Sequence, residues 1–297
     1  SIMEESQNSQ QKVEKIVARL KDIPTLPTVV QKIIEIVDSP TTSASDLNKA
    51  ILMDQALSAK VLKLVNSAFY GFPKKIETLT QAIVILGFNT VRSLALSISM
   101  VNMFQDKKGG SDLDYAEYWK HAIATSIMAR TIAKRAFPSI AEEAFVSGLL
   151  HDIGILILDQ FLPRDYKKAY DAIEKEGLQL YKAEKKHLGI THAEAGKMLA
   201  TKWNLPDPLI YAIKYHHAPS PSLDYFPLIS TVHVANIGVK LLRQGGVGDE
   251  KLYRSFHINE ESRQILRLDI DYPENYAEIL EKGMSEGEDF IAALTGK

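Results

Sequence analysis

Residues 145–154 read FVSGLLHDIG, an apolar run with a histidine and an aspartate near its centre. An isolated carboxylate in apolar surroundings is costly unless it is paired, hydrogen-bonded or bound to a metal. His151 and Asp152 must therefore satisfy each other, find neighbouring partners or hold an ion. Gly148 and Gly154 flank the pair and allow a neighbouring helix or a ligand to approach closely. The run predicts a buried helical segment that carries a polar site.

The helical repeat dominates on both sides of this run. Apolar side chains recur at spacings of three and four residues, as in residues 11–20, and two-residue alternation is nearly absent. One long helix is predicted from residue 114 or 115 to residue 136. Another is predicted to continue through residues 149–152 towards residue 158. The fold class is therefore all-α.

A polar segment near the middle of the chain suggests a division into two parts. Residues 105–114 read QDKKGGSDLD and contain two adjacent glycines, which is typical of a junction. Because the segment is short, we expect two subdomains that pack together. The predicted parts are an N-terminal helix or extension at 1–22, a helical subdomain at 23–108, and a second helical subdomain with a C-terminal extension at 109–297.

Five histidines and one aspartate are candidate metal ligands. They lie on separate predicted helices: His121, His151 with Asp152, His192, and His216 with His217. Neutral imidazole and carboxylate groups are usual ligands of Zn, Fe and Mn. Helical bundles build such sites from inward-pointing side chains of facing helices. His121 shares its helix face with Ala124 and Met128, so it is expected to point inward. These residues predict a compact mixed nitrogen and oxygen site.

The remaining histidines are assigned to structural or surface roles. A single histidine on a helix is more often hydrogen-bonded or solvated than a ligand, and this applies to His187, His233 and His257. The same argument leaves open a helical scaffold without metal, in which His151 and Asp152 pair with each other or with neighbours. A serine hydrolase with a nucleophile elbow is not expected, since the G-x-S-x-G motif is missing.

The composition is ordinary for a globular protein, and it argues against nucleic acid and membranes as binding partners. The formal net charge is -2, so nucleic acid is not expected to bind through bulk electrostatics. The chain has no cysteine, which excludes thiolate chemistry and agrees with a cytoplasmic location. The polar N-terminus does not resemble a signal peptide. The longest apolar stretch, residues 93–104, is too short to span a bilayer, and no membrane association is expected.

Over about residues 20–240 the sequence resembles the HDOD family, a divergent branch of the HD-domain superfamily. In the first half the resemblance rests on residues 23–27 (IPTLP), 53–58 (MDQALS), 65–68 (VNSA) and 81–87 (QAIVILG). In the second half it rests on residues 119–121 (WKH), 148–154 (GLLHDIG), 192–196 (HAEAG), 203–206 (WNLP) and 216–217 (HH). The resemblance implies a helical N-terminal subdomain packed on an HD-like bundle, of a kind common in bacterial signal transduction.

The resemblance also implies how the candidate ligands are shared between metals. HD relatives that hydrolyse phosphoesters bind one or more divalent ions. Carried over to this chain, a first ion would be held by His121, His151 and Asp152, and a second by His192, His216 and His217. Asp152 would bridge the two ions and act as the catalytic residue. The expected cofactor is one or two ions of Fe, Mn or Zn.

Three departures from the hydrolytic relatives affect the functional interpretation. Asn236 stands where they place an aspartate in the first metal site, and a neutral amide is a poorer ligand. Ile155 stands where cyclic-dinucleotide hydrolases carry a lysine, and no Gly-Tyr-Pro signature follows His217. These differences favour a regulatory module that binds other signalling proteins, with a small-molecule or nucleotide ligand as a further candidate. The alternative is an active metal-dependent phosphohydrolase that acts on a nucleotide or cyclic-nucleotide phosphoester.

Overall fold

The computed structural model describes residues 2–23, 25–36, 44–104, 111–286 and 288–295. Within these residues the secondary structure consists of α- and 3₁₀-helices and contains no strand, which confirms the all-α prediction. The predicted boundary between residues 108 and 109, and Pro24 of the 23–27 motif, fall outside the described residues.

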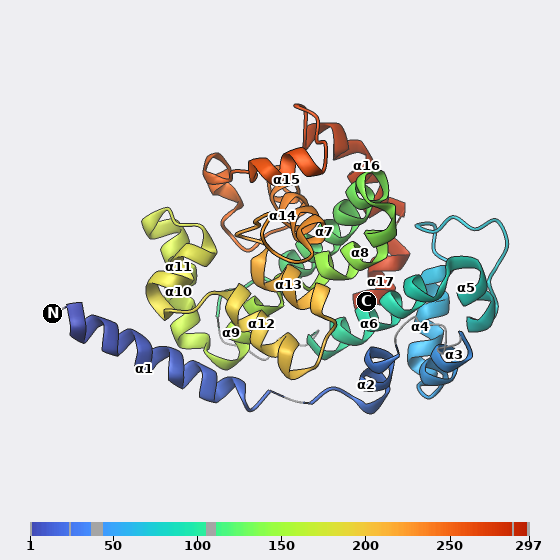
Figure 1. The fold of residues 1–297 in the computed structure, drawn as a ribbon, viewed down its shortest axis with the longest axis horizontal. Helices are drawn as coiled ribbons and strands as arrows, with labels where there is room; N and C mark the ends of the chain where they lie inside the picture. Colours follow the sequence, from blue (N-terminus) through green and yellow to red (C-terminus); the bar gives the residue numbers. More distant parts are fainter. Residues whose placement is uncertain (1, 24, 37–43, 105–110, 287, 296–297) are drawn as a thin grey trace.

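The helices form two consecutive groups along the chain (Figure 1). The first group contains α1 (Ile2–Leu20), α2 (Thr28–Glu35), α3 (Ala44–Leu52), α4 (Gln55–Val65), α5 (Leu79–Leu86) and α6 (Phe88–Phe104). The second begins with α7 (Tyr115–Ala136), η1 (Pro138–Ile140), α8 (Ala141–Leu150), α9 (Ile153–Phe161), α10 (Pro163–Glu176), α11 (Leu180–Leu188), α12 (His192–Lys202), α13 (Asp207–Tyr215) and α14 (Phe226–Leu241). It ends with η2 (Glu250–Ser255), α15 (Glu260–Ile265), η3 (Glu274–Tyr276), α16 (Ala277–Glu286) and α17 (Glu288–Thr295).

Helix α6 joins the two groups. Its side chains Leu94, Ile98 and Val101 are fully buried, and the helix packs on α2, α3, α4 and α5 as well as on α8 of the second group. The last helix, α17, returns to the first group and packs on α4 and α6. Buried apolar residues consequently form one continuous core that extends from Ile16 to Leu294.

The apolar run at residues 145–154 is broken at its polar pair. Helix α8 ends before His151 and α9 begins after Asp152, so the prediction of one helix through residues 149–152 is wrong. Asp152 departs from helical geometry, with φ -98° and ψ 13°. Consecutive side chains of a regular helix diverge around its axis, whereas this turn directs both polar side chains to one centre.

Gly154 lets another helix approach the chain directly after this turn. A Cβ atom at this position would lie 1.8 Å from the carbonyl oxygen of His192 and 2.8 Å from the backbone nitrogen of Gly196. Helices α9 and α12 are therefore in backbone contact, which only glycine permits. This close contact holds the start of α12 against the turn that carries Asp152.

One apolar segment of the described residues reaches the length needed to cross a membrane. It is Pro138–Phe161, which spans η1, α8 and α9, and 89% of its most apolar window is buried inside the structure. From the sequence we expected residues 93–104 to be the longest apolar stretch. The apolar helical segment at residues 138–161 is longer. Such burial against other helices is typical of a core segment.

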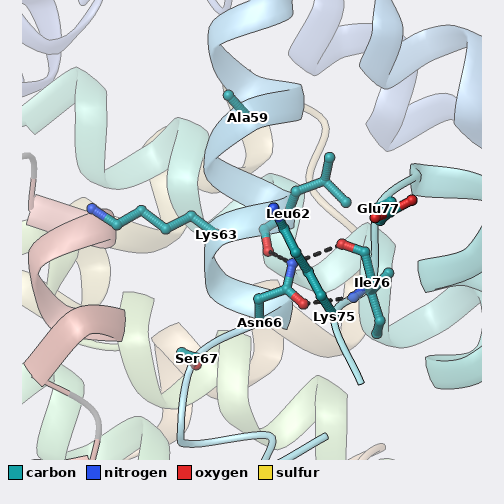
Figure 2. Close-up of a pocket in the computed structure, with 8 residues that line it drawn as sticks. All are labelled: Ala59, Leu62, Lys63, Asn66, Ser67, Lys75, Ile76 and Glu77. Atoms are coloured by element: carbon teal, nitrogen blue, oxygen red, sulfur yellow. Dashed lines mark hydrogen bonds between the residues drawn. The ribbon is translucent and has the colours of Figure 1, made fainter. Parts of the chain in front are cut away.

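In the first group, Asn66 anchors the loop that follows α4. Figure 2 shows its side chain between the end of α4 and the segment that leads to α5, beside a shallow pocket. The Asn66 amide donates to the carbonyl oxygens of Leu62 and Ile76 at 2.9 and 2.8 Å, and its oxygen accepts from the Ile76 N–H at 2.7 Å. These bonds give the VNSA motif a structural role and set the path of the chain into α5.

Candidate metal centre

The structure brings all of the predicted site residues together in the second group of helices. They come from α7 (His121), the turn between α8 and α9 (His151 and Asp152), the first residue of α12 (His192), the end of α13 (His216 and His217) and α14 (Asn236). Helices α7, α8, α13 and α14 pack on one another, and α12 packs on α9 and α13. Residues that are far apart in the sequence therefore share one buried centre.

The Asp152 carboxylate lies at the middle of this centre. Its Oδ2 atom lies 3.1 Å from His151 Nε2 and 3.7 Å from His121 Nε2. Its Oδ1 atom lies 3.2 Å from His192 Nε2 and 3.3 Å from His216 Nε2. Each oxygen thus faces a different pair of imidazoles.

Each pair is completed by a third side chain. Asn236 Oδ1 lies 2.9 Å from His121 Nε2, and His217 Nε2 lies 2.9 Å from His192 Nε2. We name the two sets after the Asp152 oxygen that they share: the Oδ2 half contains His121, His151 and Asn236, and the Oδ1 half contains His192, His216 and His217. Within each half, the imidazole nitrogens and the carboxylate lie within 4.8 Å of one another.

Hydrogen bonds behind the rings determine which nitrogen faces Asp152. His151 Nδ1 donates to the carbonyl oxygen of Gly148 at 2.6 Å, and His216 Nδ1 donates to that of Ile213 at 2.8 Å. A carbonyl oxygen only accepts hydrogen bonds, so both Nδ1 atoms carry a proton. Burial lowers the pKa of His216 to about 4, so this ring is neutral near pH 7 and its Nε2 atom presents a lone pair to the carboxylate, as metal-ligating histidines do.

This arrangement fits a cation. His216 Nε2 and Asp152 Oδ1 are both buried, and neither makes a hydrogen bond of good geometry although they are neighbours. Two acceptors that face each other in a buried site are unfavourable unless a positive charge lies between them. A divalent metal ion with nitrogen and oxygen ligands satisfies both atoms.

Three of the imidazoles and the carboxylate have the protonation states that metal ligands need. Burial lowers the pKa of His121 to about 3 and that of His216 to about 4, so both rings are neutral near pH 7. Burial and the neighbouring rings also hold the pKa of His217 well below its usual value. Burial disfavours the Asp152 carboxylate, but the surrounding imidazoles outweigh it and hold the pKa of Asp152 well below its usual value.

His192 differs from the other rings. Burial opposes its protonation, but the carboxylates of Glu184 and Asp152 outweigh burial and raise the pKa of His192 to about 10. Without a metal, His192 therefore supplies the positive charge of the centre. A bound ion would take the place of that proton on Nε2.

The centre reaches solvent at His217. This side chain is partly exposed, and its ring stacks on Tyr181 with the centroids 4.3 Å apart. His217 and Asn236 line a pocket of about 140 Å³ together with Lys240. Both halves of the centre therefore border the same opening.

The histidines that we assigned to other roles lie outside the centre. His233 Nδ1 donates to the carbonyl oxygen of His216 at 2.8 Å, and its Nε2 accepts from the N–H of Asn259 at 3.0 Å. Both ring nitrogens of His233 are thus in use, and they hold the backbone at His216. His187 pairs with Glu176 at the surface, and His257 lines the rim of the pocket.

Glu184 and Tyr166 were missed by the sequence analysis. Glu184 is fully buried and accepts hydrogen bonds from both His192 and Tyr166. In the sequence it stands beside two lysines and resembles a solvated residue. Its spacing of four from Leu180 and from Leu188, both buried, was the signal that could have placed it on the inner face of α11.

A model of the HDOD domain family matches residues 23–219. The chain belongs to the HDOD family. This result confirms the resemblance, and the match covers α2 to α6 of the first group together with all site residues except Asn236.

This HDOD chain is similar to one curated protein in sequence and to several solved structures in fold. A protein of Treponema pallidum (strain Nichols), described only as uncharacterized, is 30% identical over 242 residues, which is 81% of this chain and 46% of the relative. The chain thus spans about half the length of that curated relative. An HDOD domain protein of unknown function from Geobacter sulfurreducens has a TM-score of 0.71 at 23% identity, covering 96% of this chain and 98% of the other. A predicted phosphohydrolase from Shewanella amazonensis has a TM-score of 0.71 at 24% identity, covering 94% of this chain and 97% of the other.

Two departures of this HDOD chain from hydrolytic relatives lie at the centre itself. Ile155 is fully buried in the first turn of α9, so that position offers no cation to a ligand. Asn236 brings a neutral amide oxygen to the Oδ2 half, 3.3 Å from His151 Nε2 and closer to His121. The centre therefore has side chains that could bind a metal ion, whereas the position of Ile155 supplies no charge to a phosphate.

Proposed function

We propose that this HDOD chain is a signal-transduction protein in which the centre binds one or two divalent metal ions and the first group of helices contacts a partner protein. The proposal rests on the Asp152 carboxylate, which is buried and shared by four imidazole Nε2 atoms. Hydrogen bonds behind His151, His192 and His216 orient these rings before any ion arrives.

The surroundings of the centre favour a regulatory role over catalysis. The pocket of about 140 Å³ is small beside the roughly 300–1,000 Å³ of pockets that enclose drug-sized ligands. The buried cation at its wall, Lys240, is already paired with Asp249 at 2.9 Å. A nucleotide would therefore find little space and no free buried charge among the residues that line this pocket.

The partner contact is proposed for α3 and α5, which pack side by side. Large apolar side chains point outward there: Leu52 and Met53 are 53% and 57% exposed, and Val84 and Ile85 are 77% and 54% exposed. We name these four residues the α3–α5 patch. We propose that these exposed apolar groups on two neighbouring helices form one interaction site, because exposed apolar patches are typical of such sites.

The alternative function, a metal-dependent phosphohydrolase, draws support from the opening at His217 and Asn236. A bound divalent ion would supply Lewis acidity and an activated water there. Two residues of the chain would contribute to this reaction. Asp152 would hold both halves of the centre together, and Asn236 borders the pocket. If this alternative is right, the wild type hydrolyses phosphodiesters and Asp152→Ala does not.

The first test measures metal content and hydrolysis on the full chain, purified without chelator or nickel resin. Elemental analysis is expected to find about one to two equivalents of Fe, Mn or Zn. The same protein is expected to hydrolyse bis(p-nitrophenyl) phosphate and cyclic dinucleotides no faster than Asp152→Ala does. Turnover that the wild type shows and Asp152→Ala lacks would instead favour the phosphohydrolase. Protein without metal would contradict both functions.

The second test concerns the α3–α5 patch. Immobilised full chain is expected to capture a signalling protein from a lysate, and Val84→Asp with Ile85→Asp is expected to lose it, because two charges would then face an apolar partner surface. Ile270→Asp is the matched control, since Ile270 is 93% exposed and lies between α15 and η3. Equal capture by the double variant and the control would argue against this surface.

A further inference from the structure

The two halves of the centre differ in what stands behind their ligands. Behind His192 lies Glu184, a fully buried carboxylate of α11. His192 Nδ1 lies 2.8 and 3.0 Å from the two Glu184 oxygens, and the His192 backbone N–H donates to Oε2 at 2.8 Å. The Tyr166 hydroxyl donates to Oε1 at 2.8 Å. All of these contacts use Glu184 as an acceptor, which is the behaviour of a carboxylate.

Among the described residues, no such carboxylate stands behind the imidazoles of the Oδ2 half. His151 is backed by the carbonyl oxygen of Gly148, and the Nδ1 atom of His121 is buried without a hydrogen-bond partner. Its third member, Asn236, is neutral. Among the described residues, the shared Asp152 is therefore the one negative charge in contact with the Oδ2 half, whereas the Oδ1 half also has Glu184 behind it.

We propose that the two halves bind divalent metal with unequal affinity, and that Glu184, acting through His192, makes the Oδ1 half the tight position. The inference rests on the proposed metal binding and concerns the relative metal affinity of the Oδ1 and Oδ2 halves. A carboxylate behind a ligating histidine raises the basicity of the ring and fixes its orientation. Glu184 does both, because it holds the ring and the backbone of His192 at once.

Glu184 is thus a positioning residue, and Tyr166 holds it in place. The arrangement is rigid on the protein side, since His192 is the first residue of α12 and Thr191 with Glu194 forms a capping box there. His217 Nε2 already lies 2.9 Å from His192 Nε2. An ion that enters the Oδ1 half therefore finds its ligands assembled and two negative charges, Asp152 and Glu184, close to it. Among the described residues, an ion in the Oδ2 half finds the negative charge of Asp152 alone.

The experiment titrates metal-free full chain with Mn²⁺ or Zn²⁺ and records heat and bound metal. The wild type is expected to bind in two steps that differ by about 10–100-fold, the usual effect of a partner behind a ligand. Glu184→Gln keeps the size of the side chain but removes its charge, and it is expected to weaken the tight step by about 10–100-fold while the weak step stays unchanged. Asn236→Asp is expected to strengthen the weak step alone.

Asp159→Asn is the matched control. Asp159 is also a fully buried carboxylate that accepts a hydrogen bond from a tyrosine, Tyr115, at 2.6 Å, and it belongs to neither half of the centre. This variant is expected to leave both steps unchanged, and circular dichroism checks that each variant is folded. Two equal steps in the wild type, or a Glu184→Gln variant that binds as the wild type does, would overturn this inference alone. A wild type that binds no metal would overturn the proposed function and the inference together.

Discussion

Asp152→Ala is expected to remove metal from both halves of the centre at once. Each Asp152 oxygen faces a different pair of imidazoles, so no other single side chain belongs to both halves. Changing a group behind a ligand already costs about 10–100-fold in metal affinity. Loss of the shared carboxylate is expected to cost more than about 100-fold in each half. Elemental analysis and titration with Mn²⁺ measure the effect.

Two further variants test whether the loss of metal is due to the shared carboxylate itself. Asp152→Asn keeps one carbonyl oxygen and the shape of the side chain, so it is expected to bind more metal than Asp152→Ala and less than the wild type. Asp171→Ala removes a surface aspartate that pairs with Lys167 and is expected to change nothing. Wild-type metal content in Asp152→Ala would contradict the assignment of Asp152 as the shared ligand.

Gly154→Ala is expected to have the largest effect on stability. The added Cβ would lie 1.8 Å from the carbonyl oxygen of His192, which belongs to a backbone that cannot rotate away. Helices α9 and α12 must separate, and we expect a loss of about 3 kcal/mol in the free energy of unfolding, the upper end of the usual cost of overpacking. Because α12 begins at His192, metal affinity in the Oδ1 half is expected to fall as well.

Urea denaturation of the metal-free protein measures the stability change, and metal titration measures the second effect. Gly246→Ala is the control, since a Cβ there would meet the flexible side chain of Glu250. It is expected to cost less than about 1 kcal/mol, as most substitutions outside tightly packed contacts do. A Gly154→Ala variant as stable as Gly246→Ala would show that α9 and α12 are less closely joined than the structure has them.

The helical fold and the ligand residues could be predicted from the sequence because both leave local signals. The three-and-four spacing marks the helices, and His151 with Asp152 stands out within an apolar run. Asn236 was found through the family resemblance alone, since an asparagine in an apolar helix carries no distinctive pattern. The assignment of these residues as metal ligands stays a prediction until metal is measured.

Other features depend on contacts that no local pattern encodes. The close contact of Gly154 with the start of α12 joins positions that are more than thirty residues apart in the chain. The role of Glu184 depends on α11 and α12 packing so that it meets His192. The division of the centre into two halves requires the orientation of one carboxylate group. Each of these is set by tertiary packing and not by propensity.

The return of α17 to α4 and α6 has a consequence for the order in which the protein is built. A ribosome releases residues 55–104 long before it has made residues 288–295. The surface of α4 and α6 that α17 covers must therefore stay open to solvent or to a chaperone until residues 288–295 have been made. Contacts between segments so distant along the chain also form late, because the loop between them must first be closed. The first group of helices to emerge is consequently one of the last to be finished.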